Sequence, residues 1–205
     1  MNVLTIDTSV GVSVAILNSK GELTQSQAVD HGMQGELTAD LISQVVSKSG
    51  LEIAEITDVV VGVGPGPFTG LRVGLVTASV FAHARGVPIH GICSLDAIAF
   101  DYQKPCVVVT DARRKELYWA RYDGNRIGEP QVSKPEDLLA RFPDTEFVGP
   151  GAQIYPEVIS GKFLELKAGS LAKLFVSGAA QIVEVSPMYL RKPDAVEPTV
   201  RKSVL

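Results

Sequence analysis

The feature that most limits the fold of this chain is a repeated order of strand, acidic bend and return strand. An apolar run at residues 3–6 ends at Asp7 and is followed by a second run at 11–17. Residues 106–122 repeat this order around Asp111. Short apolar runs bounded by turn residues predict buried strands. The sequence therefore predicts two related lobes, each beginning with a hairpin that bends at a carboxylate.

A second repeat supports this interpretation. A strand predicted at residues 59–63 leads into Gly64-Pro65-Gly66, and a strand at 146–148 leads into Gly149-Pro150-Gly151. Apolar residues at helical spacing predict helices over residues 35–49 and 69–85.

The repeats also suggest where the chain divides. Ser94 is expected to cap a short helix that crosses between the lobes. We expect an N-terminal lobe at residues 1–100, a C-terminal lobe at 101–190 and a flexible tail at 191–205. The tail contains two prolines and mixed charges, which oppose a packed helix.

Composition excludes several classes of function. The chain has 205 residues, a formal net charge of −4 and a pI near 5.4, which argues against a broad basic face that grips phosphate backbones. Cys93 and Cys106 are too few for a disulfide framework. The first residues do not resemble a signal peptide and no apolar run approaches about 20 residues, so we expect a cytoplasmic protein without a membrane contact.

Asp7-Thr8-Ser9 is the first candidate site, because a carboxylate and two hydroxyls at a strand bend could meet a nucleotide phosphate or its magnesium ion. The alternative is equally open: these residue types also favour turns, where their side chains bond the local backbone. Asp111-Ala112-Arg113-Arg114 occupies the matching bend of the second lobe, where we expect a solvated turn.

The glycine-rich run from Gly64 to Gly74 is the second candidate. Its glycines permit close backbone approach, and Thr69 could cap the helix that follows, whose N-terminus could bind an anion. The run is neither a dinucleotide-binding glycine motif nor a Walker motif. Tight packing and ligand binding both remain open.

The helix predicted at 69–85 has too little polar surface for an ordinary surface helix. We expect Val73, Val80 and Ala84 to face the sheet. The opposite face is expected to bind a partner, together with the apolar stripe of the preceding helix; these candidate residues are Leu37, Leu41, Val45, Arg72, Val76, Ser79 and His83. The alternative is that the second lobe buries this helix.

We find no catalytic or metal site in the sequence. His31, His83 and His90 lack the spacing that places two ligands on one helical face. No Gly-x-Ser-x-Gly motif is present, and neither cysteine lies in a context that indicates an activated nucleophile.

The run from Gly64 to Gly74 resembles the GPGSFTGLRVG signature of the TsaB (YeaZ) family, with Pro67 where that family has Ser. The resemblance covers nearly the whole chain. It includes residues 4–9, 91–97, 111–120 and 189–191, while the stretch between Gly161 and Ser177 looks shortened.

The resemblance implies a two-lobed, actin-like α/β fold with duplicated βββαβα-type lobes, as in acetate kinase and the heat-shock chaperone ATPases. It implies a non-catalytic subunit required for threonylcarbamoylation of adenosine in transfer RNA. The partners would be a catalytic TsaD-type subunit and a TsaE-type ATPase, with transfer RNA reached through the complex. Without that partner, the same surface could close a homodimer.

The resemblance also bears on cofactors. The catalytic subunit holds a metal with a His-x-x-x-His pair, and the matching positions here are Ser94 and Ile98. It implies no tightly bound cofactor, with ATP or ADP at the interface with the catalytic subunit. The alternative function is an independent ATP-dependent enzyme using Asp7 and Asp111, or a glycopeptidase-like hydrolase of the same superfamily.

Overall fold

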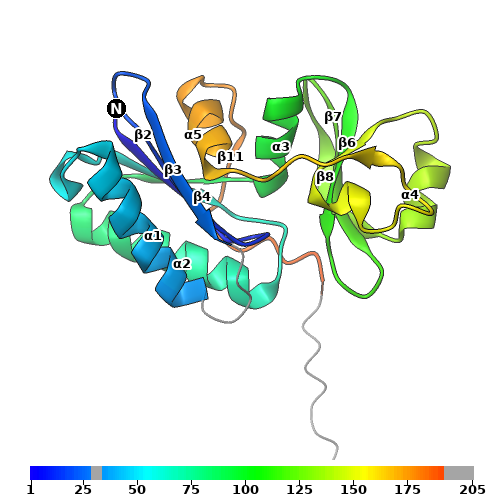
Figure 1. Cartoon of the computed structure of the whole chain (residues 1–205), viewed down its shortest axis with the longest axis horizontal. Helices are drawn as coiled ribbons and strands as arrows, with labels where there is room; N and C mark the ends of the chain where they lie inside the picture. The colour runs from blue at the N-terminus through cyan, green and yellow to red at the C-terminus, as the bar shows by residue number, and fades with distance from the viewer. Residues whose placement is uncertain (29–33, 192–205) are drawn as a thin grey trace, which may run out of the picture.

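The computed structural model describes residues 1–28 and 34–191, which are arranged around two β-sheets with helices between and beside them (Figure 1). The first sheet contains, in spatial order, β11 (Ile182–Val183), β5 (Ile89–Ile92), β4 (Asp58–Gly62), β1 (Val3–Asp7), β2 (Val12–Leu17) and β3 (Leu23–Ala28). The second contains β10 (Gly161–Lys162), β9 (Phe147–Val148), β6 (Cys106–Asp111), β7 (Leu117–Asp123) and β8 (Asn125–Ser133).

The two sheets share one pairing plan. In the first sheet, β1 pairs antiparallel with β2 and parallel with β4, and β2 pairs antiparallel with β3. In the second, β6 pairs in the same ways with β7 and β9, and β7 pairs antiparallel with β8. The predicted duplication and the predicted two-lobed, actin-like α/β fold are thus confirmed.

The helices cover the first sheet on both faces. In Figure 1, α1 (Gln34–Ser49) and α2 (Phe68–Arg85) lie side by side along one face, and α5 (Ala168–Val176) lies on the other. The alternation along each strand explains this arrangement. Leu4 and Ile6 of β1 face the core beneath α1 and α2, whereas Val3 joins the core beneath α5.

The second lobe is a reduced copy of the first. Between β8 and β9 it has only the seven-residue α4 (Pro135–Arg141). After Gly149 it has the short 3₁₀ helix η2 (Pro150–Gln153), where the first lobe has the 18-residue α2. Its sheet is covered on one side by α3 (Ser94–Tyr102), which packs Leu95 and Ile98 into the second core.

The chain returns to the first lobe before it ends. The stretch that looked shortened in the sequence still forms α5, whose Leu171 and Leu174 pack on the first sheet, and β11 extends that sheet beside β5. In space, residues 168–183 therefore accompany the first sheet, although their position in the sequence lies within 101–190. The expectation for the tail concerns residues that, apart from Arg191, lie outside the described ranges.

Two predicted helix caps are wrong. Helix α3 begins at Ser94 itself with Cys93 at the cap position, and the Ser94 hydroxyl donates to Asp7 instead of capping the helix. Helix α2 begins at Phe68 after Pro67, so Thr69 lies inside the first turn. Within the described ranges, no helix has the length and apolar character needed to cross a membrane.

Candidate functional site

The bend at Asp7-Thr8-Ser9 forms a buried cluster of hydrogen-bonded polar side chains, which we call the Asp7 cluster. Asp7 is 1% exposed and accepts three hydrogen bonds: from the Ser9 backbone N–H at 2.8 Å, the Ser9 hydroxyl at 2.6 Å and the Ser94 hydroxyl at 2.5 Å. Thr8 donates to the Gly70 carbonyl at 2.7 Å. Burial raises the pKa of the Asp7 carboxyl, and the three hydrogen bonds partly oppose that rise.

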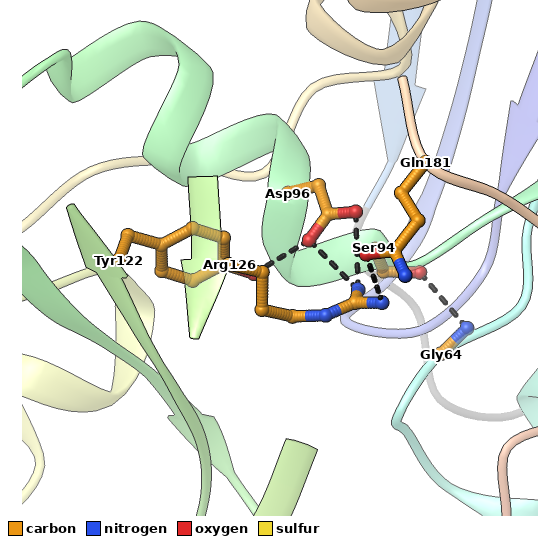
Figure 2. Close-up of polar contacts among 6 residues, drawn as sticks. All are labelled: Gly64, Ser94, Asp96, Tyr122, Arg126 and Gln181. Atoms are coloured by element: carbon orange, nitrogen blue, oxygen red, sulfur yellow. Dashed lines mark hydrogen bonds and ion pairs between the residues drawn. The ribbon is translucent and has the colours of Figure 1, made fainter. Parts of the chain in front are cut away.

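The glycine-rich run packs directly on the Asp7 cluster. A Cβ atom on Gly66 would lie 2.9 Å from Ser9 Cα, and one on Gly74 would lie 2.2 Å from Thr8 Oγ1. The Gly64 N–H donates to Ser94 Oγ at 3.0 Å (Figure 2). The glycines are therefore needed for close packing, which was one of the two interpretations left open by the sequence. The assignment of Asp7, Thr8 and Ser9 to a phosphate stays a prediction.

Removing the Asp7 carboxylate tests how much the Asp7 cluster stabilises the fold. We expect Asp7→Ala to lower the free energy of unfolding by about 2 kcal/mol, because the Ser9 and Ser94 hydroxyls lose their acceptor while remaining buried. The matched control is Asp111→Ala, because Asp111 ends β6 as Asp7 ends β1, but its side chain is 31% exposed. Its loss should cost below about 1 kcal/mol. Urea unfolding of both variants measures the difference; equal effects would contradict the role given to Asp7.

The raised pKa of Asp7 also predicts a pH dependence. The folded chain binds the Asp7 proton more tightly than the unfolded chain, whose ordinary pKa is 3.8. The contribution of this group to stability is therefore fully present below that value and is lost as the pH rises through the folded pKa. We expect wild type to lose stability relative to Asp7→Asn as the pH rises from about 4 to 7. A difference that is constant across urea unfolding curves in this range would contradict the prediction.

The outer face of α2 carries most of the predicted partner-binding residues. Arg72, Val76, Ser79 and His83 are all exposed, with Val76 at 61%. Val80, which we expected to face the sheet, is 62% exposed, and Ala84 is exposed as well. That part of the prediction is wrong.

The helix turns a different face to the sheet. Gly70, Leu71, Gly74, Leu75, Ala78 and Ala82 are its buried residues. The mean apolar character of the sequence could not show which of two apolar faces the sheet would cover.

The predicted residues of α1 divide between core and surface. Leu41 is 6% exposed and Val45 is fully buried, and both belong to the core between α1 and the first sheet. Leu37 is half-buried at the edge of the same core. Of these three residues, only Leu37 is partly exposed to solvent. The groove between α1 and α2 has a volume of about 480 Å³ and is lined by Ala39, Ile42, Ser43, Val46, Ser47, Ile53, Thr77 and Phe81.

A second cavity, which we call the Arg–Tyr pocket, was missed by the sequence analysis. It measures about 300 Å³ and is lined by residues 66–68, residues 111–114, Tyr118, Tyr189 and Arg191. Three sequence blocks that carried the family resemblance meet there: the glycine run, the block after β6 and the block at 189–191. No periodicity predicts this convergence, because the blocks are far apart along the chain.

The turn after β6 has an unusual backbone. Arg113, Arg114 and Lys115 have φ angles of 60°, 53° and 61°, a conformation that costs about 1–2 kcal/mol for each non-glycine residue. The turn is held from two sides. Asp111 accepts the Arg113 N–H at 2.7 Å, and Arg191 donates to the Ala112 carbonyl at 2.9 Å.

A buried ion pair joins the lobes beside α3 (Figure 2). Arg126 Nη1 lies 2.9 Å from Asp96 Oδ1 and 3.1 Å from Oδ2, and the Tyr122 hydroxyl donates to Oδ1 at 2.7 Å. Arg126 Nη2 donates to Gln181, just before β11, at 3.0 Å. Burial, together with the Asp96 carboxylate that accepts a hydrogen bond from its hydroxyl, raises the pKa of Tyr122 well above its usual value. The cluster ties β7 and β8 to α3 and to the chain segment that returns to the first sheet.

Comparison with known proteins identifies a family model and several relatives that match this chain. The family model for tRNA N6-adenosine threonylcarbamoyltransferase (TsaD) matches residues 35–199. The uncharacterized protein ML0378 of Mycobacterium leprae is 39% identical over 94% of this chain, which spans 55% of that protein's length. The Escherichia coli tRNA threonylcarbamoyladenosine biosynthesis protein TsaB is 27% identical, covering 93% of this chain and 95% of its own. YeaZ from Pseudomonas aeruginosa has the same fold, with a TM-score of 0.76 at 22% identity over 92% of this chain and 99% of its own.

The chain belongs to the TsaB/YeaZ family. Ser94 and Ile98 stand at the positions where a TsaD-type relative is expected to have its metal-binding pair. Both residues are fully buried. The Ser94 hydroxyl is hydrogen-bonded to Asp7 and to the Gly64 N–H, and Ile98 packs in the second core. Both positions therefore have structural contacts in this TsaB/YeaZ chain.

Proposed function

We propose that this chain takes part in threonylcarbamoyladenosine formation in transfer RNA as a non-catalytic subunit that binds a TsaD-type catalytic subunit. Two findings support this proposal: the match to the threonylcarbamoyltransferase family model and the relatives named for threonylcarbamoyladenosine biosynthesis. The proposed partners are the catalytic subunit first, a TsaE-type ATPase in the assembly, and transfer RNA through the complex.

The exposed apolar face of α2 is the observation that carries the proposal. Val76 and Val80 lie one helical turn apart and are each more than 60% exposed. Between them in the sequence, Ala78 is fully buried, so the two valines lie on the outer face of the helix. Large apolar side chains that adjoin an apolar groove mark an interaction surface. Here the groove between α1 and α2 adjoins them, with Phe81 on its wall.

A relative of the same fold is a suitable partner for this surface. Two pairs of helices, one from each subunit, would pack as a bundle and bury both apolar faces. The same geometry allows two copies of this chain to pair isologously, so we propose a homodimer when the catalytic subunit is absent.

The structural contacts of Asp7 and His90 support the proposed non-catalytic role. Asp7 is fully engaged by Ser9 and Ser94, and His90 lies 3.2 Å from Asp58 and packs against Phe175. Among residues 1–28 and 34–191, no three His, Cys, Asp or Glu side chains gather where they could hold a metal ion. The prediction that ATP or ADP binds at the interface with the catalytic subunit is kept as part of this proposal.

Co-purification tests the proposed function. The untagged chain, mixed with a tagged TsaD-type subunit from the same organism, is expected to co-elute in a stoichiometric complex that supports threonylcarbamoylation of a transfer RNA transcript. Neither subunit alone should do so. Full modification activity by the catalytic subunit without this chain would overturn the proposal, and so would threonylcarbamoyl transfer by this chain alone.

A further inference from the structure

Residues 187–191, which we call the strap, join the two lobes. The Met188 N–H donates to the carbonyl of Val63, which follows β4 of the first lobe, at 2.8 Å. The Met188 side chain packs both against the core beneath α1 and α2 and against the second core. At the end of the strap, Arg191 donates to the Ala112 carbonyl of the second lobe at 2.9 Å. A short stretch of chain is therefore fixed to both lobes.

The first-lobe end of the strap is held by the exposed side of α2. The Tyr189 ring stacks on Phe68, with the ring centroids 4.8 Å apart. Arg72 fixes this pair, since its guanidinium lies 4.0 Å from the Phe68 centroid and its Nε donates to the Tyr189 hydroxyl at 3.0 Å. Four-residue spacing places Phe68 and Arg72 on the same side of the helix as Val76 and Val80. The strap thus contacts the stripe of α2 that we propose as the partner surface.

The second-lobe end of the strap holds the turn after β6. The φ angles of residues 113–115 lie between 53° and 61°, and non-glycine residues persist in this conformation only where the surrounding structure determines it. Arg191 supplies a contact of this kind at the carbonyl of Ala112, directly before these residues, and its ion pair with Glu116 lies directly after them. The strap therefore grips the turn at both of its ends.

We propose that the strap couples the partner surface of α2 to the conformation of the turn after β6. The turn is left-handed while Arg191 holds it, and ordinary negative φ angles become available when that contact is lost. A partner that covers Phe68 and Arg72 restrains Tyr189 and, through the strap, Arg191, so it favours the left-handed turn. Coupling of this kind is reciprocal, because a held turn also favours the arrangement of α2 that the partner binds. The partner's position on α2 rests on the proposed function, whereas the contact between strap and turn belongs to the isolated chain.

Hydrogen exchange in the isolated full chain, followed by NMR, tests the contact between strap and turn. The amides of Ala112, Arg113 and Glu116 report on the turn, because each donates a hydrogen bond within it. We expect Tyr189→Leu, which removes the stacked ring and its hydroxyl, to speed their exchange at least about fivefold, and Arg191→Met to do the same. Tyr189→Phe keeps the ring and removes the hydroxyl alone, so it gives a second reading in which the core packing is unchanged; we expect at least about twofold faster exchange.

Tyr102→Leu is the matched control. Tyr102 is also a half-buried tyrosine with a hydrogen-bonded hydroxyl, but it ends α3 and bonds to Glu146, which precedes β9. It should leave exchange in the turn within about twofold of wild type. Equal acceleration in the Tyr102 and Tyr189 variants would show a general loosening of the fold and would overturn the coupling. Unchanged exchange in either Tyr189→Leu or Arg191→Met would overturn it as well.

Addition of a saturating TsaD-type subunit separates this inference from the proposed function. We expect the same three amides to exchange at least about fivefold more slowly in the wild-type complex, and to change by less than about twofold in the Tyr189→Leu complex. Equal slowing in both complexes would show that the partner covers the turn directly, which overturns the coupling. A complex that forms without slower exchange overturns the coupling and leaves the proposed function standing. If no complex forms, the proposed function and the partner half of the coupling both fail, while the isolated chain still decides whether the strap holds the turn.

Discussion

Replacing Val76 with glutamate should abolish the complex with a TsaD-type subunit and leave the fold of this chain intact. Val76 is 61% exposed on α2, so the new carboxylate can stay hydrated in the isolated chain. In a helical bundle the same carboxylate would be desolvated among apolar side chains without a partner charge, which costs several kcal/mol. We expect pairing to weaken at least a hundredfold, about 2.7 kcal/mol or more.

Val176→Glu is a matched control for this experiment. Val176 is also a helical valine and is 50% exposed, but it lies at the end of α5, which covers the other face of the first sheet. It should leave pairing unchanged. Size-exclusion chromatography of the mixed subunits, with circular dichroism of each variant alone, makes the comparison. A retained complex with Val76→Glu would show that α2 is not the partner surface, and loss of pairing in both variants would remove the specificity of the result.

Breaking the ion pair beside α3 should cause the largest loss of stability among single substitutions considered for this chain. Arg126→Met keeps most of the side-chain volume but leaves the Asp96 carboxylate buried, with the Tyr122 hydroxyl and the Cys93 thiol as its remaining side-chain donors. Removing one partner of a buried pair costs about 3–5 kcal/mol. For a chain of this size we expect the melting temperature to fall by roughly 6–20 °C, at about 2–4 °C per kcal/mol.

The double variant Arg126→Met with Asp96→Asn separates the charge from the packing. It removes the unpaired carboxylate while keeping a group that accepts from Tyr122, so it should recover at least half of the lost stability. Thermal unfolding of wild type, both single variants and the double variant completes the cycle. If the double variant is as unstable as the sum of the two single changes, the loss reflects packing of the arginine stem and not the buried charge.

Much of the fold was predictable because hydrophobic periodicity is a local property. The short apolar runs around Asp7 and Asp111 predicted both hairpins, and the helical spacing over 35–49 predicted α1 within one residue at its start. The residue pattern did not predict strands β3 and β8, since residues 23–28 and 125–133 are largely polar and lie at sheet edges. At such positions backbone pairing with a neighbouring strand stabilises the element, and no apolar pattern is required.

The candidate site was predicted in part. The composition of α2 correctly indicated that an apolar face remains uncovered, and Val76 lies on it. The same composition placed Val80 and Ala84 against the sheet, which is wrong, because both faces of the helix are apolar and the buried face is the one that carries Leu71, Leu75 and Ala78. Hydropathy does not distinguish two apolar faces of one helix, so the side chains that pack against the sheet could not be read from it.

By itself the sequence determined which segments avoid water, where the strands bend at carboxylates, and that one plan occurs twice. The tertiary structure alone decided which segments meet. It brought α5 and β11 back to the first sheet, paired Asp96 with Arg126, and gathered Phe68, Arg113 and Tyr189 around one pocket. The physical reason is that burial is encoded in each segment's own pattern, whereas the choice of neighbour depends on the shapes and charges of residues that are distant along the chain.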